Sequence, residues 1–302
     1  MPLGTVTISA VLLGQSLKTG IESLAATDVP SPRMNAELLL MFALGCDRAY
    51  LYGHPERQLT AREEAIYEKA LADRSRGIPA QYITGHQEFW GMDLIVTPAV
   101  LIPRPETEHV IERVLELCPP GDERRSPEAE SCRIVDVGTG SGCISLALAK
   151  ALPHAELHAT EISEAALEIA RANAARHQLE NRICFHRCDL LAGMDAESFD
   201  IVVSNPPYVG QSEEEEVQLE VRKFEPGSAV FAGPTGLEVI ERLIPEAWRV
   251  LKRQGWMVLE ISGTIASRVR GSLRGWENVH IANDLRLIPR VLSAKKPDRL
   301  KS

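Results

Sequence analysis

From residue 133 onward the chain alternates short apolar runs with longer amphipathic segments, and this alternation is the feature that most constrains its fold. The apolar runs predict strands, and the segments between them predict helices. The predicted strands cover 133–137, 156–162, 182–189, 200–204 and 256–261, followed by two extended runs at 277–283 and 286–294. The predicted helices between them cover 143–152, 163–178 and 235–251. This order predicts a doubly wound, seven-stranded α/β sheet, and such sheets bind ligands beyond the carboxyl ends of their strands.

The N-terminal part of the chain lacks this alternation. Ser31 followed by Pro32 predicts a helix start, and Thr60 with Glu63 has the spacing of a capping box. Residues 81–85 and 89–96 predict extended strands around turns, and a helix is predicted over 106–117. We therefore expect three parts, which are an N-terminal helical domain over 1–78, a linking β-hairpin over 79–105 and the α/β domain over 106–302.

A glycine-rich loop follows the first strand of the predicted sheet. It reads Gly138-Thr139-Gly140-Ser141-Gly142, and its glycines allow a tight turn and a close approach of the backbone to a ligand. Dinucleotide-binding proteins carry GxGxxG at this place, whereas the spacing here is GxGxG. The second predicted strand ends in Glu161, whose carboxylate can accept both hydroxyl groups of a ribose. The two features indicate an adenosine-containing ligand and leave a nicotinamide cofactor and S-adenosylmethionine both open.

A second motif, Asn205-Pro206-Pro207-Tyr208, follows the fourth predicted strand at the same edge of the sheet. Each proline fixes φ and lacks an N–H donor, so carbonyl acceptors remain beside the side-chain oxygen of Asn205. These acceptors can hold both hydrogens of an –NH₂ group, and Tyr208 offers a flat face to a planar group. The nitrogen of an amide or aromatic amine is a poor nucleophile because its lone pair is delocalised. Acceptors that favour a pyramidal nitrogen can aim that lone pair at an electrophile.

The charge balance limits the class of partner. The chain has 42 acidic and 33 basic residues and a net charge of −9, which argues against tight general binding to nucleic acid. No apolar run approaches the roughly 20 residues that span a bilayer, and the N-terminus lacks the pattern of a signal peptide. We expect a cytoplasmic protein that binds no membrane and no nucleic acid stably. The acidic run at 213–216 is interpreted as a solvated face, with a flap over a protein substrate as the alternative.

The six cysteines do not suggest a metal site or a disulfide framework. None belongs to a CxxC pair. Cys184 and Cys188 are four residues apart and share one face of a predicted strand, and we expect His186 between them to face the other side. We interpret the cysteines as small apolar residues of a reduced protein, and we expect no bound metal.

The two motifs together resemble class I S-adenosylmethionine-dependent methyltransferases that act on a planar nitrogen. Two branches of that group share Asn-Pro-Pro-Tyr: the adenine amino-methyltransferases of nucleic acids, and the PrmC/HemK family, which methylates the glutamine amide of peptide chain release factors. Further stretches are similar to the second branch over essentially the whole chain. Three of these stretches, 78–85, 89–91 and 101–108, precede the methyltransferase fold. The others are 224–226 with Gly233 and Gly236-Leu237 after Asn-Pro-Pro-Tyr, and 284–285 with 289–291 in the C-terminal strands.

The resemblance implies a Rossmann-like class I methyltransferase fold and assigns roles to individual residues. The residues that would bind S-adenosylmethionine are Gly138, Thr139, Gly140, Ser141, Gly142, Glu161, Leu190 and Asn205. Aspartate is more usual in the family at the position of Glu161, and an aromatic residue can stand at that of Leu190. The substrate clamp would be Asn205, Pro206, Pro207 and Tyr208, with Asn205, Pro206 and Tyr208 in the catalytic role. We place no catalytic role on 260–264.

The resemblance also implies a reaction and a partner. The enzyme would transfer a methyl group to the side-chain amide nitrogen of the glutamine in the Gly-Gly-Gln motif of class 1 release factors, which act in translation termination. The N-terminal helical domain would bind another part of the release factor, and we expect the enzyme to be a monomer. The alternative is an adenine amino-methyltransferase acting on DNA or RNA, which would need a basic face and a target-recognition region. The net charge of −9 disfavours that alternative.

Overall fold

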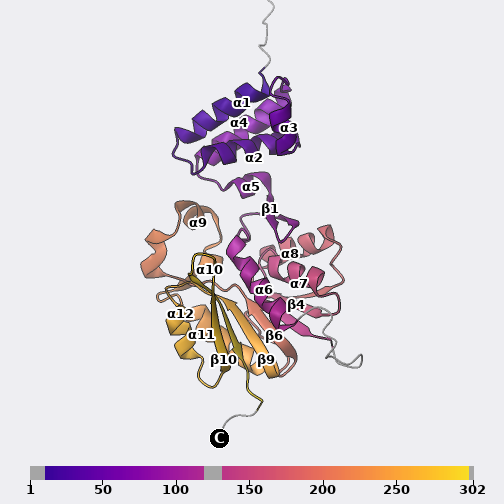
Figure 1. The fold of residues 1–302 in the computed structure, drawn as a ribbon, viewed down its shortest axis with the longest axis vertical. Helices are drawn as coiled ribbons and strands as arrows, with labels where there is room; N and C mark the ends of the chain where they lie inside the picture. The colour runs from indigo at the N-terminus through magenta and orange to yellow at the C-terminus, as the bar shows by residue number, and fades with distance from the viewer. Residues whose placement is uncertain (1–10, 119–130, 299–302) are drawn as a thin grey trace, which may run out of the picture. The chain divides into compact units, whose positions relative to one another are not determined.

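The computed structural model describes residues 11–118 and 131–298, and the chain divides into two units, Met1–Gly85 and His86–Ser302 (Figure 1). Each unit has its own hydrophobic core. The first ten residues, to which the expectation about a signal peptide partly refers, lie outside the described residues. Within the described ranges, no helix has both the length and the apolar composition needed to cross a bilayer.

The first unit is a bundle of helices, as the sequence predicts. Thr60 and Glu63 form the predicted capping box, because the Glu63 N–H donates to the Thr60 hydroxyl (3.3 Å) and the Thr60 N–H donates to the Glu63 carboxylate (2.8 Å). The core of the bundle buries leucines from α1 and α2, among them Leu24 and Leu39. The helices are α1 (Leu13–Ala25), α2 (Pro32–Leu44), α3 (Arg48–Gly53), α4 (Ala61–Ser75) and α5 (Ala80–Thr84).

The predicted helix start at Ser31 and Pro32 is confirmed, because α2 begins at Pro32 with Ser31 as its N-cap residue. Ser31 has a left-handed backbone (φ 50°) and makes no capping bond with its side chain, and the Asn35 side chain donates to the Ser31 carbonyl (3.2 Å). One local prediction in this region is wrong. The segment predicted as a strand at 81–85 is the helix α5, which follows Pro79 and is closed by Gly85 at φ +78°. The hairpin consists only of β1 (His86–Phe89) and β2 (Met92–Ile95), paired antiparallel.

The second unit contains the predicted seven-stranded sheet. Its order is β10-β11-β9-β6-β3-β4-β5, in which β11 runs antiparallel to both of its neighbours and the other pairs are parallel. The strand β9 begins five residues before its predicted start, because a register shift lets Leu251 pair with Phe199 ahead of the main ladder. The strands are β3 (Arg133–Val137), β4 (Glu156–Glu161), β5 (Ile183–Arg187), β6 (Phe199–Ser204), β9 (Leu251–Glu260), β10 (Glu277–Asn283) and β11 (Pro289–Lys295).

Helices cover both faces of this sheet (Figure 1). One face packs against α6 (Glu108–Leu117), α7 (Cys143–Ala151) and α8 (Glu164–Arg176), and against the β1–β2 hairpin. The other face packs against α11 (Glu238–Val250) and α12 (Ala266–Ser272). Between β6 and α11 the chain forms the short elements β7 (Val209–Gly210), η2 (Gln211–Glu216), α9 (Leu219–Phe224), α10 (Gly227–Val230) and β8 (Phe231–Gly233). The acidic run at 213–216 lies in η2 and is largely exposed, in agreement with a solvated face.

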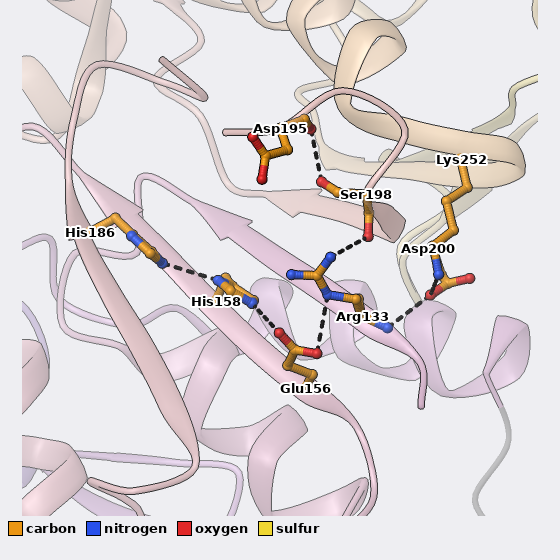
Figure 2. Close-up of polar contacts among 8 residues, drawn as sticks. All are labelled: Arg133, Glu156, His158, His186, Asp195, Ser198, Asp200 and Lys252. Atoms are coloured by element: carbon orange, nitrogen blue, oxygen red, sulfur yellow. Dashed lines mark hydrogen bonds and ion pairs between the residues drawn. The ribbon is translucent and has the colours of Figure 1, made fainter. Parts of the chain in front are cut away.

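A network of polar side chains joins β3, β4 and β5 (Figure 2). The rings of His158 and His186 stack, with 3.0 Å between Nδ1 of His158 and Nε2 of His186. His158 also contacts the Glu156 carboxylate (2.8 Å), which forms an ion pair with Arg133 (3.1 Å). The prediction that His186 faces away from Cys184 is wrong, because alternate residues of a strand share a face. Burial and the neighbouring His158 lower the pKa of His186 below its usual value.

The lowered pKa of His186 predicts a loss of stability in acid. The unfolded chain takes up a proton near pH 6.5 and the folded chain only at lower pH, so the contribution of His186 is complete above pH 6.5 and is lost as the pH falls below it. When the pH is lowered from 7.5 to 5, we expect the melting temperature of the wild type to fall further than that of His186→Gln. His280→Gln, at an exposed position of β10, serves as the control. If the melting temperatures of wild type and His186→Gln differed by the same amount at both pH values, the prediction would be contradicted.

Candidate active site

A cavity of about 400 Å³ lies beyond the carboxyl ends of β3, β4 and β6. Its volume is within the range of small-molecule sites, and its place is the one at which doubly wound sheets bind ligands. Nine of the residues singled out from the sequence line it: Gly138, Thr139, Gly140, Ser141, Glu161, Leu190, Asn205, Pro206 and Pro207. Gly142 and Tyr208 do not line this cavity.

The three glycines of the loop have different surroundings. Gly138 (φ +70°) and Gly140 (φ +56°) are left-handed, and a Cβ atom on either would meet no atom within 4 Å. A Cβ on Gly142 (φ +86°) would lie 3.2 Å from a Leu146 methyl group and 3.3 Å from the Ala170 Cβ. The first two glycines therefore leave room next to the cavity, whereas Gly142 lets α7 pack closely against α8.

The side chain of Asp136, the penultimate residue of β3, is hydrogen-bonded to the glycine-rich loop and to the start of α7. Its Oδ2 accepts hydrogen bonds from the hydroxyl groups of Thr139 and Ser145, both at 2.6 Å, and from the Ser145 N–H at 3.2 Å. Its Oδ1 is buried without a partner among the described residues. Burial raises the pKa of Asp136 to about 6. No role was predicted for Asp136 from the sequence, although an acidic residue inside an apolar strand just before the loop was a usable signal.

Glu161 ends β4 with its carboxylate at the cavity. Its Oε2 accepts the Gly140 N–H (3.0 Å) and its Oε1 accepts the Ser163 N–H (3.0 Å). A carboxylate oxygen has two lone pairs, so each oxygen keeps one for a ligand hydroxyl. Leu190 lines the same cavity with an aliphatic side chain, from a left-handed backbone (φ 49°). A carboxylate acceptor and an apolar side chain thus both line the cavity.

The tetrapeptide after β6 forms a wall between two cavities. A second cavity, of about 180 Å³, is lined by Tyr208 and Glu260 together with apolar residues such as Val217 and Val221. Asn205 and Pro207 line both cavities. Groups bound on the two sides of this wall would therefore approach each other at Asn205.

Two residues that adjoin the wall, Thr107 and Glu260, were given no role from the sequence. Glu260, the last residue of β9, is 2% exposed and accepts hydrogen bonds from the hydroxyl groups of Thr107 (2.6 Å) and Tyr208 (3.2 Å). The Thr107 hydroxyl also accepts a hydrogen bond from Nδ2 of Asn205 (3.1 Å). Burial raises the pKa of Glu260, and burial with the charge of Glu260 raises that of Tyr208. The only sequence signal for Glu260 was a charged residue that ends an apolar strand at this edge.

An ion pair joins the segments before and after the wall. Glu225 is buried, accepts the Ile102 N–H (3.1 Å) and forms an ion pair with Arg104. Arg104 lines both cavities. In the part of the chain that the structure describes, no three His, Cys, Asp or Glu residues are grouped as a metal ion would require.

Comparisons with known proteins place this geometry in a family. The PrmC N-terminal domain family matches residues 15–85, and the methyltransferase small domain family matches residues 124–224. Among solved structures, the hMettl16 catalytic domain in complex with the MAT2A 3′UTR hairpin 6 aligns with a TM-score of 0.55. It is 19% identical and the alignment covers 77% of this chain and 84% of that one, a likeness that shows the fold alone.

Curated relatives match along nearly the whole chain. The release factor glutamine methyltransferase of Koribacter versatilis is 52% identical over 286 residues, which cover 94% of this chain and 99% of the relative. The protein of the same name from Chlorobaculum tepidum is 40% identical, with 92% of this chain and 95% of the relative covered. With its N-terminal helices, its class I methyltransferase fold and a tetrapeptide wall between two cavities, the chain belongs to the release factor glutamine methyltransferase family.

Proposed function

We propose that this chain transfers the methyl group of S-adenosylmethionine to the side-chain amide nitrogen of the glutamine in the Gly-Gly-Gln motif of class 1 release factors. The observation that carries the proposal is the wall shared by the two cavities at Asn205 and Pro207. A methyl donor in the larger cavity and a glutamine side chain in the smaller one would meet at Asn205. Membership of the family, in which curated relatives are named for this activity, supports the same reading.

The larger cavity would hold the methyl donor. When bound, S-adenosylmethionine supplies an electrophilic methyl group on a sulfonium centre. Glu161 would accept the ribose hydroxyl groups with its free lone pairs, and Leu190 would contact the adenine through apolar surface. The loop residues that would bind the rest of the donor are Gly138, Thr139, Gly140, Ser141 and Gly142. No metal takes part in this scheme.

The clamp would activate the amide nitrogen. Oδ1 of Asn205 and the carbonyl of Pro206 would accept its two hydrogens, which favours a pyramidal nitrogen and aims the lone pair at the methyl carbon. The N–C bond forms as the C–S bond breaks, and the electron pair of that bond passes to sulfur. The surplus proton leaves the nitrogen afterwards, to an acceptor of the clamp or to water, so no strong base is needed. Tyr208 would pack its ring on the amide plane, and Pro207 would keep the wall rigid.

The N-terminal helical domain, over residues 1–78 and linked by the segment 79–105 to the methyltransferase domain, would bind the body of the release factor. One glutamine side chain offers little surface for recognition, and binding energy from remote contacts can serve to position the reacting group. We infer that the enzyme acts as a cytoplasmic monomer and binds no nucleic acid stably, in line with its net charge of −9.

The test is to incubate the protein with labelled S-adenosylmethionine and a purified class 1 release factor, and to map the label by mass spectrometry. We expect one methyl group on the glutamine of the Gly-Gly-Gln motif. A DNA duplex and an RNA hairpin are run in parallel. Methylation of adenine in either of them, with an unmodified release factor, would refute the proposal and favour the alternative branch.

We expect Asn205→Ala to lower kcat by about 10²–10³-fold, because the variant loses an acceptor for the transition state. The fold should remain intact in a thermal melt. The measurement is turnover at saturating S-adenosylmethionine, with Asn181→Ala as a control at an exposed position just before β5. Turnover close to that of wild type would exclude the proposed clamp.

We expect Glu161→Ala to weaken binding of S-adenosylmethionine by about tenfold or more while kcat falls much less. A contact to the ribose, remote from the methyl group, stabilises the ground state and the transition state alike. Calorimetry gives the affinity and steady-state kinetics give kcat, with Glu168→Ala on the exposed side of α8 as the control. An unchanged affinity would remove Glu161 from the cofactor site.

We expect deletion of residues 1–85 to leave binding of S-adenosylmethionine intact, because every residue that lines the larger cavity belongs to the second unit. The same deletion should lower kcat/KM strongly for an intact release factor and only slightly for a short Gly-Gly-Gln peptide. The comparison uses both substrates with the full-length and the truncated enzyme. Equal fractional losses for protein and peptide would indicate that the helical domain only stabilises the enzyme.

A further inference from the structure

We propose that Thr107 and Glu260 are positioning residues that fix the orientation of the Asn205 side-chain amide, so that its oxygen faces the substrate. This inference rests on the proposed function, because it assigns the substrate nitrogen to Oδ1 of Asn205. Thr107 borders the larger cavity and Glu260 the smaller one, but their polar side-chain atoms are bonded to Asn205, to Tyr208 and to each other. Their effect would pass through Asn205 and Tyr208.

The contacts behind the clamp form a series of hydrogen bonds that all donate in one direction, from Asn205 toward Glu260. Nδ2 of Asn205 donates to the Thr107 hydroxyl (3.1 Å), and that hydroxyl donates to Oε2 of Glu260 (2.6 Å). Thr107 ends η1 (Pro105–Thr107), Glu260 ends β9, and Asn205 follows β6. The two hydrogen bonds therefore link three separate segments of the protein. Thr107 and Glu260 are each 2% exposed, which leaves water little access to replace either partner.

The number of hydrogens on these groups fixes which of them donates in each hydrogen bond. A hydroxyl group has one hydrogen, and each oxygen of Glu260 accepts from a hydroxyl group, Oε2 from Thr107 and Oε1 from Tyr208. The Thr107 hydrogen is therefore committed to Glu260, and its oxygen can only accept from Asn205. If the Asn205 amide turned over, its carbonyl oxygen would meet an oxygen with no hydrogen to offer. The –NH₂ group consequently faces Thr107, and Oδ1 is directed away from Thr107.

The second carboxylate oxygen of Glu260 is hydrogen-bonded to Tyr208, the last residue of the clamp. Its Oε1 accepts the hydroxyl hydrogen of Tyr208 (3.2 Å). One buried carboxylate thus holds Asn205 through Thr107 and holds Tyr208 directly, with the two prolines between them. The acceptor oxygen and the tyrosine ring are set in place before the substrate arrives, as efficient catalysis of this kind requires.

The decisive pair of variants is Thr107→Val and Thr107→Ser. Valine keeps the shape of threonine but removes the hydroxyl group, whereas serine keeps the hydroxyl and loses a methyl group. We expect kcat for release factor methylation to fall about 10–100-fold in Thr107→Val and to stay within about threefold of wild type in Thr107→Ser. The Kd for S-adenosylmethionine should stay within about threefold in both. Thr264→Val, at an exposed position, is the control.

Glu260→Gln tests the same inference without a change of volume. Its amide can donate to the Thr107 oxygen, which frees the Thr107 hydrogen to meet the carbonyl of Asn205 and removes the preference for one orientation. We expect kcat to fall about 10–100-fold with little change in melting temperature. A crystal structure of this variant, with its hydrogen-bond partners refined at high resolution, shows whether the Asn205 amide has turned.

The outcomes separate the two hypotheses. A wild-type enzyme that leaves the release factor unmethylated overturns the proposed function and the positioning role together. An active wild type with equal kcat in Thr107→Val and Thr107→Ser, or with full activity in Glu260→Gln, overturns the positioning role alone. A loss in Thr107→Val that appears equally in the Kd for S-adenosylmethionine and in melting temperature, with Glu260→Gln unaffected, shows a purely structural role and also overturns it.

Discussion

The parallel register of three central strands is the constraint on which the site depends. Val137 of β3 pairs with Thr160 of β4 on one side and with Ser204 of β6 on the other. The next residue of each strand or loop therefore emerges at the same level, and these are Gly138, Glu161 and Asn205. Parallel strands impose this convergence, because all their carboxyl ends lie at one edge. A slip of one residue in either ladder would turn the side chains of that strand to the opposite face.

Buried carboxylates hold the loops that this register brings together. Asp136 is hydrogen-bonded to the hydroxyl groups of Thr139 and Ser145, and Glu260 to those of Thr107 and Tyr208. Burial raises the pKa of both acids, which means that the ionised form costs free energy in the folded state. Such groups persist where they fix a geometry that apolar packing would leave loose. Here each of them sets a loop that borders a cavity.

Much of the fold and part of the site could be predicted from the sequence because those features are local. The spacing of apolar residues predicted all seven strands. The glycines that follow the first of these strands predicted the edge of the sheet at which the cavity lies. The helix α5 was missed because five residues are too few to show a helical period, and its Pro79 and Gly85 boundaries also suit turns. The bond from Thr107 to Glu260 joins residues 153 positions apart, and Arg104 meets Glu225 across 121 positions. No local pattern encodes such pairs.

The stacked histidines of β4 and β5 lie at one margin of the sheet, and the described segment between β5 and β6 contains no helix. Among the described residues β5 is also the last strand on its side of the sheet, so one row of its backbone groups has no neighbouring strand. It is only five residues long, and its Arg187 forms an ion pair with Glu164. Short strands with charged side chains resist pairing with strands of other molecules. The shortness of β5 and the charge of Arg187 at its end thus disfavour edge-to-edge pairing between copies of this protein.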